Sequence, residues 1–450
     1  MKYDHLAASL RSAMAREDQT AIGKLLHDMQ DADLADFLSN EDADTTLALL
    51  NQLPLNERAD VFGYLDADAQ LALSRLLDDR ELAQLVDQMD ADERADLFNL
   101  LSTGRQQAIL RSLAQEERED LRRLSSYAEG TAGAIMTSDY VVVPADASVD
   151  DALQIIRTSA PDAETIYQIY VLDEQQRIAG VLSLRDLILA APQKAVSKIM
   201  AQEVISTPVE TPQEEVAKLI ARYDLLALPI TNGGDRLVGI VTYDDAMDVV
   251  EEETTEDIHK GGTIGKLDGS LRGASLFTLY RKRVGWLVLL AFANIISGAG
   301  IAYYEDTIAT YVVLVFFFPL LMASGGNAGA QAATLMVRGL ATGDVHLRDW
   351  GKLLGKELLV AGALGLTMSA AIASIGAVRG GSDVALVVAL SMFVIVILGS
   401  LIGMCLPFIL NRLKLDPATA SAPLVTTIAD VTGVIVYFSI ATAILTMPTA

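Results

Sequence analysis

The residue that most strongly suggests chemistry is Asp430, the only ionisable side chain in the long apolar run 422–447. The run reads APLVTTIADVTGVIVYFSIATAILTM and is long enough to cross a bilayer as a helix. A carboxylate inside hydrocarbon is costly, so such residues usually face the interior of a helix bundle or a water-filled path. Two interpretations therefore stand: a structural Asp that is protonated or bonded to a neighbouring helix, or a cation site on a permeation path.

A second apolar run, 311–337, contains a stripe of uncharged polar residues. They are spaced by three, four and three positions, which places them on one face of a helix: Ser324, Asn327, Gln331 and Thr334. Pro319 and Gly325-Gly326 loosen this helix, and loosened backbone at membrane depth is tolerated only where protein buries it or it lines a wet cavity. The stripe is therefore predicted to line a pore. A phosphate-cradling loop at GGNAG is disfavoured because no strand precedes it.

Acidic residues are concentrated just before the apolar half, in the stretch DVVEEETTEDIHKGG at 248–262. Four of them fall on one side of a predicted helix: Glu252, Glu253, Glu256 and Asp257. Like charges four residues apart destabilise a helix, and a divalent cation bound there would relieve the repulsion. The alternative is a solvated linker.

The charge of the chain is divided unevenly. Residues 1–260 hold 50 acidic and 22 basic side chains, a net charge of -28, whereas the rest of the 450 residues carries a net charge of +3. An acidic surface argues against nucleic-acid binding and favours multivalent cations. Cys405 is the one cysteine, which excludes a disulfide framework or thiolate cluster within one chain. No His/Cys/Ser constellation suggests an enzyme.

The acidic half divides into two patterns. Residues 1–130 predict an acidic domain of short amphipathic helices, and the echo of LADFL, ERADVFGYL and ERADLFNLL suggests a helical solenoid. Most of its acids are expected on a solvated face, with Asp60, Asp92 and Asp96 as candidate cation contacts. The amino terminus has no apolar signal-peptide region, so we expect this half to be cytoplasmic.

The second pattern, 131–250, is a duplication. Ile135-Met136 recurs as Ile199-Met200, and GVLSLRDLI recurs as GIVTYDDAM. These motifs resemble a tandem pair of CBS domains, at 131–200 and 201–250, whose Ser/Thr and Asp residues in many members contact an adenine nucleotide such as ATP. The positions this implies are Ser183, Arg185 and Asp186, or Thr242 and Asp245. The alternative is that these residues only cap the helices that follow.

After residue 250, the sequence pattern predicts a linker helix over 251–283 and a membrane domain over 284–450. Five spans are expected, at about 284–303, 311–337, 358–378, 384–410 and 422–447. Glycines in GxxxG steps, such as Gly325/Gly329 and Gly399/Gly403, predict close helix packing. Basic residues alternate with acidic ones between the spans, which places the amino-terminal half in the cytoplasm and the carboxyl terminus outside the plasma (inner) membrane.

Taken together, the chain resembles the MgtE family of magnesium channels and transporters. The resemblance rests on PLLMASGGNAGAQAATL, LDPATASAPLVTTIADVTG, TTEDIHK and the order of the domains. It implies a multidomain membrane protein with an all-α superhelical N domain, an α/β CBS pair, a linker (plug) helix and five membrane helices. It also implies a homodimer in the lipid bilayer, with Mg2+ as substrate and regulator and a pore lined by the second and fifth membrane helices.

The resemblance also implies roles for particular residues. Asp430 becomes the pore carboxylate with Thr426 one turn earlier, and Asp416 meets Glu253, Glu256 and Asp257 across a bound ion. Acids of the second CBS copy become regulatory ligands: Asp224, Asp245, Asp248 and Glu214. Ala422 and Pro212 depart from the polar or acidic residues that relatives carry, which leaves the number of regulatory ions open.

Flux is expected to be passive, driven by the membrane potential and stopped by rising cytosolic Mg2+. A slow carrier, a membrane-anchored nucleotide receptor and an anion channel are the alternatives. An anchor needs no polar stripe, and an anion channel requires basic residues in the spans.

Overall fold

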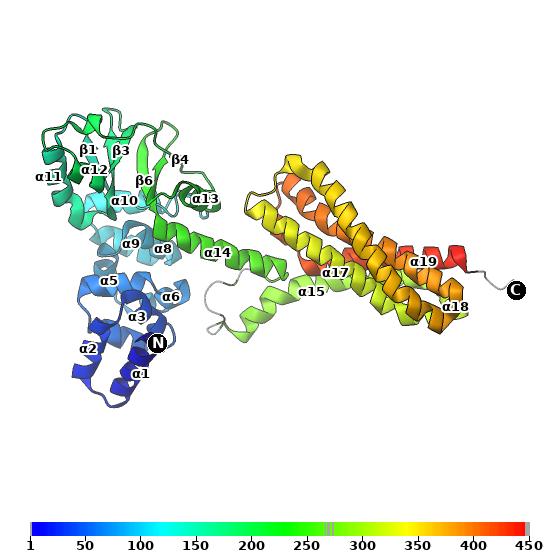
Figure 1. Cartoon of the computed structure of the whole chain (residues 1–450). Helices are drawn as coiled ribbons and strands as arrows, with labels where there is room; N and C mark the ends of the chain where they lie inside the picture. Colours follow the sequence, from blue (N-terminus) through cyan, green and yellow to red (C-terminus); the bar gives the residue numbers. More distant parts are fainter. Residues whose placement is uncertain (1, 266, 268–270, 272–273, 446–450) are drawn as a thin grey trace. The chain divides into compact units, whose positions relative to one another are not determined.

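A computed structural model describes residues 2–265, 267, 271 and 274–445 (Figure 1). The chain divides near residue 253 into two compact units. The last two positions of the run 422–447 lie outside the described residues, as does part of the predicted linker.

The N domain of the first unit is a solenoid of ten short helices. They are α1 (Lys2–Ala15), α2 (Gln19–Asp28), α3 (Asp31–Leu38), α4 (Ala43–Leu50), α5 (Leu55–Gly63), α6 (Ala67–Leu76), α7 (Asp79–Asp87), α8 (Ala91–Leu100), α9 (Thr103–Ser112) and α10 (Gln115–Leu124). From α3 onward each helix packs on the next but one, so odd-numbered and even-numbered helices form two rows. This confirms the predicted all-α superhelical N domain.

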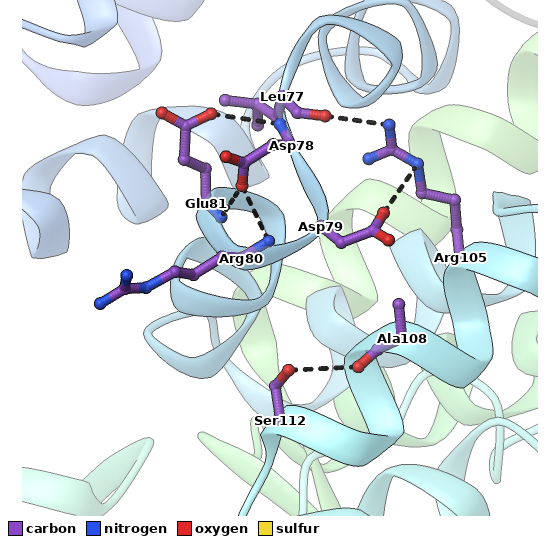
Figure 2. Close-up of polar contacts among 8 residues, drawn as sticks. All are labelled: Leu77, Asp78, Asp79, Arg80, Glu81, Arg105, Ala108 and Ser112. Atoms are coloured by element: carbon purple, nitrogen blue, oxygen red, sulfur yellow. Dashed lines mark hydrogen bonds and ion pairs between the residues drawn. The ribbon is translucent and has the colours of Figure 1, made fainter.

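Polar contacts at the helix ends hold the rows in place. The side chain of Asp78 accepts hydrogen bonds from the backbone N–H groups of Arg80 and Glu81, both at 2.8 Å, and caps α7 (Figure 2). Arg105 of α9 donates to the carbonyl of Leu77 at 2.9 Å and lies 3.5 Å from a carboxylate oxygen of Asp79 (Figure 2). Asp18, Asp42 and Asp66 cap α2, α4 and α6 in the same way as Asp78 caps α7.

Two copies of one α/β motif follow, as a CBS pair requires. The first contains β1 (Tyr140–Pro144), α11 (Val149–Ser159), β2 (Thr165–Leu172), β3 (Ile178–Ser183) and α12 (Leu184–Leu189). The second contains β4 (Thr207–Pro208), α13 (Gln213–Tyr223), β5 (Ala227–Thr231), β6 (Leu237–Thr242) and α14 (Tyr243–Gly261). In both sheets the first strand pairs parallel with the second, and the second antiparallel with the third. Single turns of 3-10 helix lie at Ala160–Asp162 and Val196–Lys198.

The duplicated Met and Gly positions pack against each other across the two copies. A Cβ added at Gly239 would lie 2.6 Å from Met136 Sδ, and one at Gly180 would lie 2.7 Å from Met200 Sδ. Backbone bridges between Thr137 and Ile240 and between Val181 and Ala201 adjoin these contacts. The repeated Met and Gly residues are therefore explained by packing, because a side chain at either glycine would clash with the methionine.

The second unit is a bundle of long apolar helices. It contains α15 (Leu276–Tyr303), α16 (Glu305–Thr310), α17 (Val313–Ala341), α18 (Trp350–Arg412) and α19 (Ala422–Ile444), with single 3-10 turns η3 (Leu347–Asp349) and η4 (Pro417–Thr419). By length and composition, four helices of the described chain are able to cross a membrane, one of them the stretch Leu347–Arg412. The bundle core lies among α17, α18 and α19.

The predicted third and fourth spans are the two arms of α18. The helix is interrupted at Gly381, whose φ of 81° and ψ of -174° are not helical. The arms run antiparallel, because Ser369 Oγ donates to the carbonyl of Ala389 at 2.7 Å and Gly376 lies against Ala385 (Figure 1). The loop expected around 379–383 is thus a glycine break, a conformation that glycine adopts without steric cost.

The linker helix differs from its predicted bounds of 251–283. Helix α14 begins at Tyr243, as the last helix of the second CBS copy, and ends at Gly261. Thr263 has a φ of 57°, which takes the chain out of helical geometry directly after Gly261-Gly262. Through Glu253 the helix belongs to the first unit, and from Thr254 to the second.

Candidate cation path and regulatory acids

One face of α17 is occupied by packing within the chain. A Cβ added at Gly329 would lie 2.7 Å from the carbonyl oxygen of Gly399 in α18, and one at Gly325 would lie 2.5 Å from Ile395 Cγ2. On the side facing α19, a Cβ at Gly326 would lie 2.9 Å from Thr426 Cγ2. The glycines let three helices approach closely, as the GxxxG spacing predicts.

The opposite face of α17 carries most of the polar stripe. Asn327, Gln331 and Thr334 are exposed, and a helical rotation of about 100° per residue places them across the helix from Gly325 and Gly329. Within the described part of the chain, neither the Asn327 nor the Gln331 amide has a hydrogen-bond partner. Such amides are poorly suited to face lipid.

Ser324 differs from the other residues of the stripe. Its side chain is buried, and its hydroxyl donates to the carbonyl of Leu320 at 2.7 Å. It lies at the edge of the polar face, about 60° from Asn327 around the helix. Thr334 also bonds its own helix, donating to the carbonyl of Ala330 at 2.9 Å, but it remains exposed. Within a single chain, Ser324 does not lie on the open surface that the other three share.

Helix α19 places Asp430 one turn after Thr426. Ser421 caps its start, and the Tyr437 hydroxyl donates to the carbonyl of Leu314 at 2.9 Å, which fixes α19 against α17. Asp430 is partly exposed and forms no hydrogen bond or ion pair with another residue that the structure describes. No bond to a neighbouring helix therefore accounts for this carboxylate among the described residues.

Asp416 and the linker acids are brought together only in part. Lys260 Nζ lies 2.5 Å from Asp416 Oδ2 and also forms an ion pair with Glu256, one helical turn earlier on α14. Glu253 instead accepts a hydrogen bond from Gln213 at 2.8 Å, within the first unit. Asp257 directly follows Glu256 on α14. An ammonium group thus joins Asp416 to Glu256.

A second group of acids lies around α8 in the first unit. Asp92, Glu93 and Asp96 are residues of α8, and Asp245 and Glu164 lie near them. Burial, followed by the charge of Asp245, raises the pKa of Asp92 to about 8. Burial, with Asp92 as the largest charge, raises the pKa of Glu93 to about 9. Burial and Glu129 raise the pKa of Asp96 to about 6, and burial and Asp90 raise that of Glu164 to about 8. With these pKa values Asp92, Glu93 and Glu164 hold protons at neutral pH, whereas Asp96 is largely ionised.

Asp92 is the focus of this group. Its Oδ1 is buried and accepts no hydrogen bond from the described part of the chain. Burial also raises the pKa of Asp245, although its hydrogen bond from Thr242 opposes the effect. The sequence pattern did not identify Glu93 or Glu164. Glu93 adjoins Asp92 in the ERADLF repeat and lies where a Cβ on Gly63 would stand, whereas Glu164 is in a loop without a motif.

The other predicted acids are more dispersed. Burial and Asp31 raise the pKa of Asp60, and burial and Glu251 raise that of Asp248. Glu214 forms an ion pair with Lys218 at 2.7 Å, and Asp224 ends α13 with a φ of 52°. Within the described residues, no group of three or more His, Cys, Asp or Glu side chains is arranged to hold a metal ion.

The candidate nucleotide residues form a helix cap. The Asp186 backbone N–H donates to Ser183 Oγ at 3.1 Å and the Ser183 backbone N–H donates to Asp186 Oδ2 at 3.0 Å, which together form a capping box at α12. Ser183 Oγ also donates to Asp186 Oδ2 at 2.6 Å. The hydrogen bond from Ser183 lowers the pKa of Asp186. Arg185 is exposed beside them. The capping alternative therefore describes these contacts, and nucleotide binding stays a prediction.

Family models match three parts of the chain. The "Divalent cation transporter" model MgtE matches residues 318–440, the "MgtE intracellular N domain" model matches 29–130, and the CBS domain model matches 132–192 and 196–252. The first includes α17 from Phe318, all of α18 and α19 through Ile440.

Comparison with individual proteins points to the same family as the family models. The chain is 44% identical over 322 residues to the magnesium transporter MgtE of Thermus thermophilus, covering 72% of each chain. It is 40% identical over 321 residues to MgtE of Bacillus subtilis, covering 71% of each. A crystal structure of the cytosolic domain of the Mg2+ channel MgtE in complex with ATP is 36% identical, with a TM-score of 0.52, over 54% of this chain and 99% of that one. The chain therefore belongs to the MgtE family of divalent cation transporters, a family of membrane transporters and not of enzymes.

Proposed function

We propose that this chain is a Mg2+ transporter in which two copies form one passive pore, with the Asp430 carboxylates facing the shared axis. The observation that carries the proposal is Asp430 itself, a carboxylate in an apolar span without a partner among the described residues. The names of the relatives, which are magnesium transporters, support Mg2+ as the substrate.

The polar face of α17 supports a pore between two copies. Its glycine face is occupied within the chain, whereas Asn327 and Gln331 remain exposed on the other side. Amides at membrane depth require protein or water as neighbours. A second copy that brings the same face towards them would supply both.

Mg2+ is a hard ion that prefers oxygen ligands and sheds its water reluctantly. A pair of carboxylates with amide and hydroxyl oxygens nearby attracts a largely hydrated ion without enclosing it, which permits release. An inside-negative potential favours entry by about 2.3 kcal/mol per elementary charge per 100 mV, and by about twice that for a divalent ion. In this proposal the amino-terminal half is cytoplasmic and the carboxyl terminus lies outside the plasma (inner) membrane. A slow carrier with the same site is the alternative.

The acids of the first unit support regulation by cytosolic Mg2+. Asp92, Glu93 and Asp245 are partly buried near one another, and Asp92 Oδ1 has no hydrogen-bond donor among the residues that the structure describes. When ionised they repel, so Mg2+ binding would favour a compact arrangement over a more open one. A ligand shifts such an equilibrium only by its differential affinity, so several weak sites are expected to act together and close the pore.

An adenine nucleotide is a second proposed regulator. The related cytosolic domain was crystallised with ATP, and Ser183, Arg185 and Asp186 of the first CBS copy are the corresponding candidates here. The cap that these side chains form leaves Arg185 exposed for a phosphate.

The test is Mg2+ uptake into proteoliposomes that hold the full chain, with an entrapped Mg2+ indicator and an imposed inside-negative potential. Asp430→Asn should abolish the flux, because it removes the pore charge while keeping the size of the side chain. Asp383→Asn, an acid beside the break in α18, should leave flux unchanged. Undiminished flux through Asp430→Asn would refute the pore assignment, and flux that ignores the potential would refute passive transport.

A further inference from the structure

Lys260 connects two segments that are 156 residues apart in the sequence. It lies in the last turn of α14, where its ammonium is 2.5 Å from Asp416 Oδ2 and pairs with Glu256 four residues earlier. All three groups belong to the second unit. Their side chains are 32%, 38% and 23% exposed respectively, so the contact is partly shielded from water.

The Asp416 side of this contact leads directly to the proposed pore helix. Asp416 Oδ1 accepts a hydrogen bond from the backbone N–H of Ala418 at 2.8 Å and so caps η4, which immediately precedes α19. One carboxylate therefore holds both the end of α14 and the turn before the helix of Asp430. Releasing Lys260 would free α14 from this turn.

Lys260 lies where a regulatory cation is expected. Glu256 and Asp416 are both candidate Mg2+ ligands, and their two carboxylates together carry a charge of -2. The Lys260 ammonium between them reduces the charge of the group to -1. Partial burial lowers the pKa of Lys260, but hydrogen bonds to Asp416 and Glu256 raise it above its ordinary value, so the ammonium stays charged. A divalent ion and an ammonium repel each other, and the long, flexible Lys side chain is able to move away.

We propose that Lys260 is an internal cation that holds α14 to Asp416 when Mg2+ is scarce and is displaced by Mg2+ as its concentration rises. The inference rests on the proposed regulation by cytosolic Mg2+ and adds a specific residue to it. Lys260 gives the linker a metal-independent contact and, as a competitor for the same oxygens, raises the Mg2+ concentration needed to occupy them.

Hydrogen–deuterium exchange of the full chain in detergent tests this without a transport assay. Peptides covering 254–262 and 413–424 report the contact in metal-free buffer and along a Mg2+ titration. Partly exposed ion pairs contribute modestly, so Lys260→Gln should speed exchange of both peptides about two- to five-fold without metal. The Mg2+ midpoint for protection should fall by a similar factor, because the competitor is gone. At saturating Mg2+ the variant and the wild type should match.

Two further variants complete the design. Lys414→Gln removes the same charge two residues before Asp416, where Lys414 has no ion pair among the described residues, and should behave as wild type. Lys260→Arg keeps the charge and should retain metal-free protection. The inference is overturned if Lys260→Gln exchanges as the wild type does without metal, or if Lys414→Gln reproduces its effect. Failure of Mg2+ to protect the wild type would instead overturn the proposed Mg2+ regulation, while the metal-free comparison still decides whether Lys260 holds the contact.

Discussion

Replacing Asp96 by Asn should stabilise the metal-free soluble half of this protein at neutral pH. Asp96 lies in α8, where burial and the charge of Glu129 raise its pKa to about 6 from an ordinary value of 3.8. Because the Asp96 side chain is exposed to solvent, screening reduces the cost of ionising it in the folded state to about 1 kcal/mol. The wild type bears that cost once Asp96 ionises, and the neutral amide does not.

The pH dependence follows from the direction of the shift. Below pH 3.8 the carboxyl is protonated in both folded and unfolded chains, so its full contribution to stability is present. As the pH rises, the unfolded chain releases the proton first, and the folded state loses stability until Asp96 itself ionises near pH 6. The advantage of Asp96→Asn should therefore be small at pH 4.5 and largest above pH 7.

Thermal unfolding of fragment 1–262 at both pH values measures the difference in stability between the wild type and Asp96→Asn. The measurement is made once with chelator and once with Mg2+. For a domain of this size, about 1 kcal/mol corresponds to a Tm increase of about 2–4 °C. Mg2+ should stabilise the wild type more than Asp96→Asn, because a binding carboxylate is lost in the variant. Glu203→Gln, an exposed acid in a loop, should change neither quantity. The reasoning is refuted if Asp96→Asn lowers the metal-free Tm at neutral pH, or if its effect is equal at both pH values.

Three other perturbations test the membrane unit and the CBS pair. Gly329→Ala places a methyl group 2.7 Å from the Gly399 carbonyl oxygen, so it should cost about 1–3 kcal/mol and lower the melting temperature of the protein in detergent, whereas Gly285→Ala, which meets nothing within 4 Å, should not. Asn327→Leu should lower Mg2+ flux in proteoliposomes without changing that melting temperature, and unchanged flux would remove Asn327 from the path. Ser183→Ala should cost about 0.5–2 kcal/mol through the lost helix cap. It should also weaken ATP binding, measured by calorimetry, if Ser183 contacts a phosphate; unaltered affinity would leave capping as its only role.

Several features followed from the sequence because they depend on local pattern. The GxxxG spacing predicted the close packing of Gly329 on α18, and the repeated Met and Gly motifs predicted a duplicated α/β unit. Because these local patterns determine the elements and their packing, the predicted multidomain fold class is confirmed. The break at Gly381 was expected as a loop, because charged residues interrupt the apolar run there.

Other features depend on tertiary contacts that no periodicity encodes. The sequence pattern does not single out Lys260, because only the folded chain places its ammonium beside the Asp416 carboxylate. Glu164 has no motif, and it joins the acidic group only through packing within the first unit. Ser324 fits the polar stripe by spacing, yet burial and a bond to its own helix separate it from Asn327.

The central claim is that Mg2+ passes Asp430 and that cytosolic Mg2+ decides when it does. Recording currents from the full chain in a planar bilayer, with Mg2+ titrated on the cytosolic side, tests it most directly. We predict a Mg2+ current that follows the voltage, falls as cytosolic Mg2+ rises into the millimolar range, and is absent in Asp430→Asn. A variant that conducts as the wild type does, or a wild-type current indifferent to cytosolic Mg2+, would contradict the account.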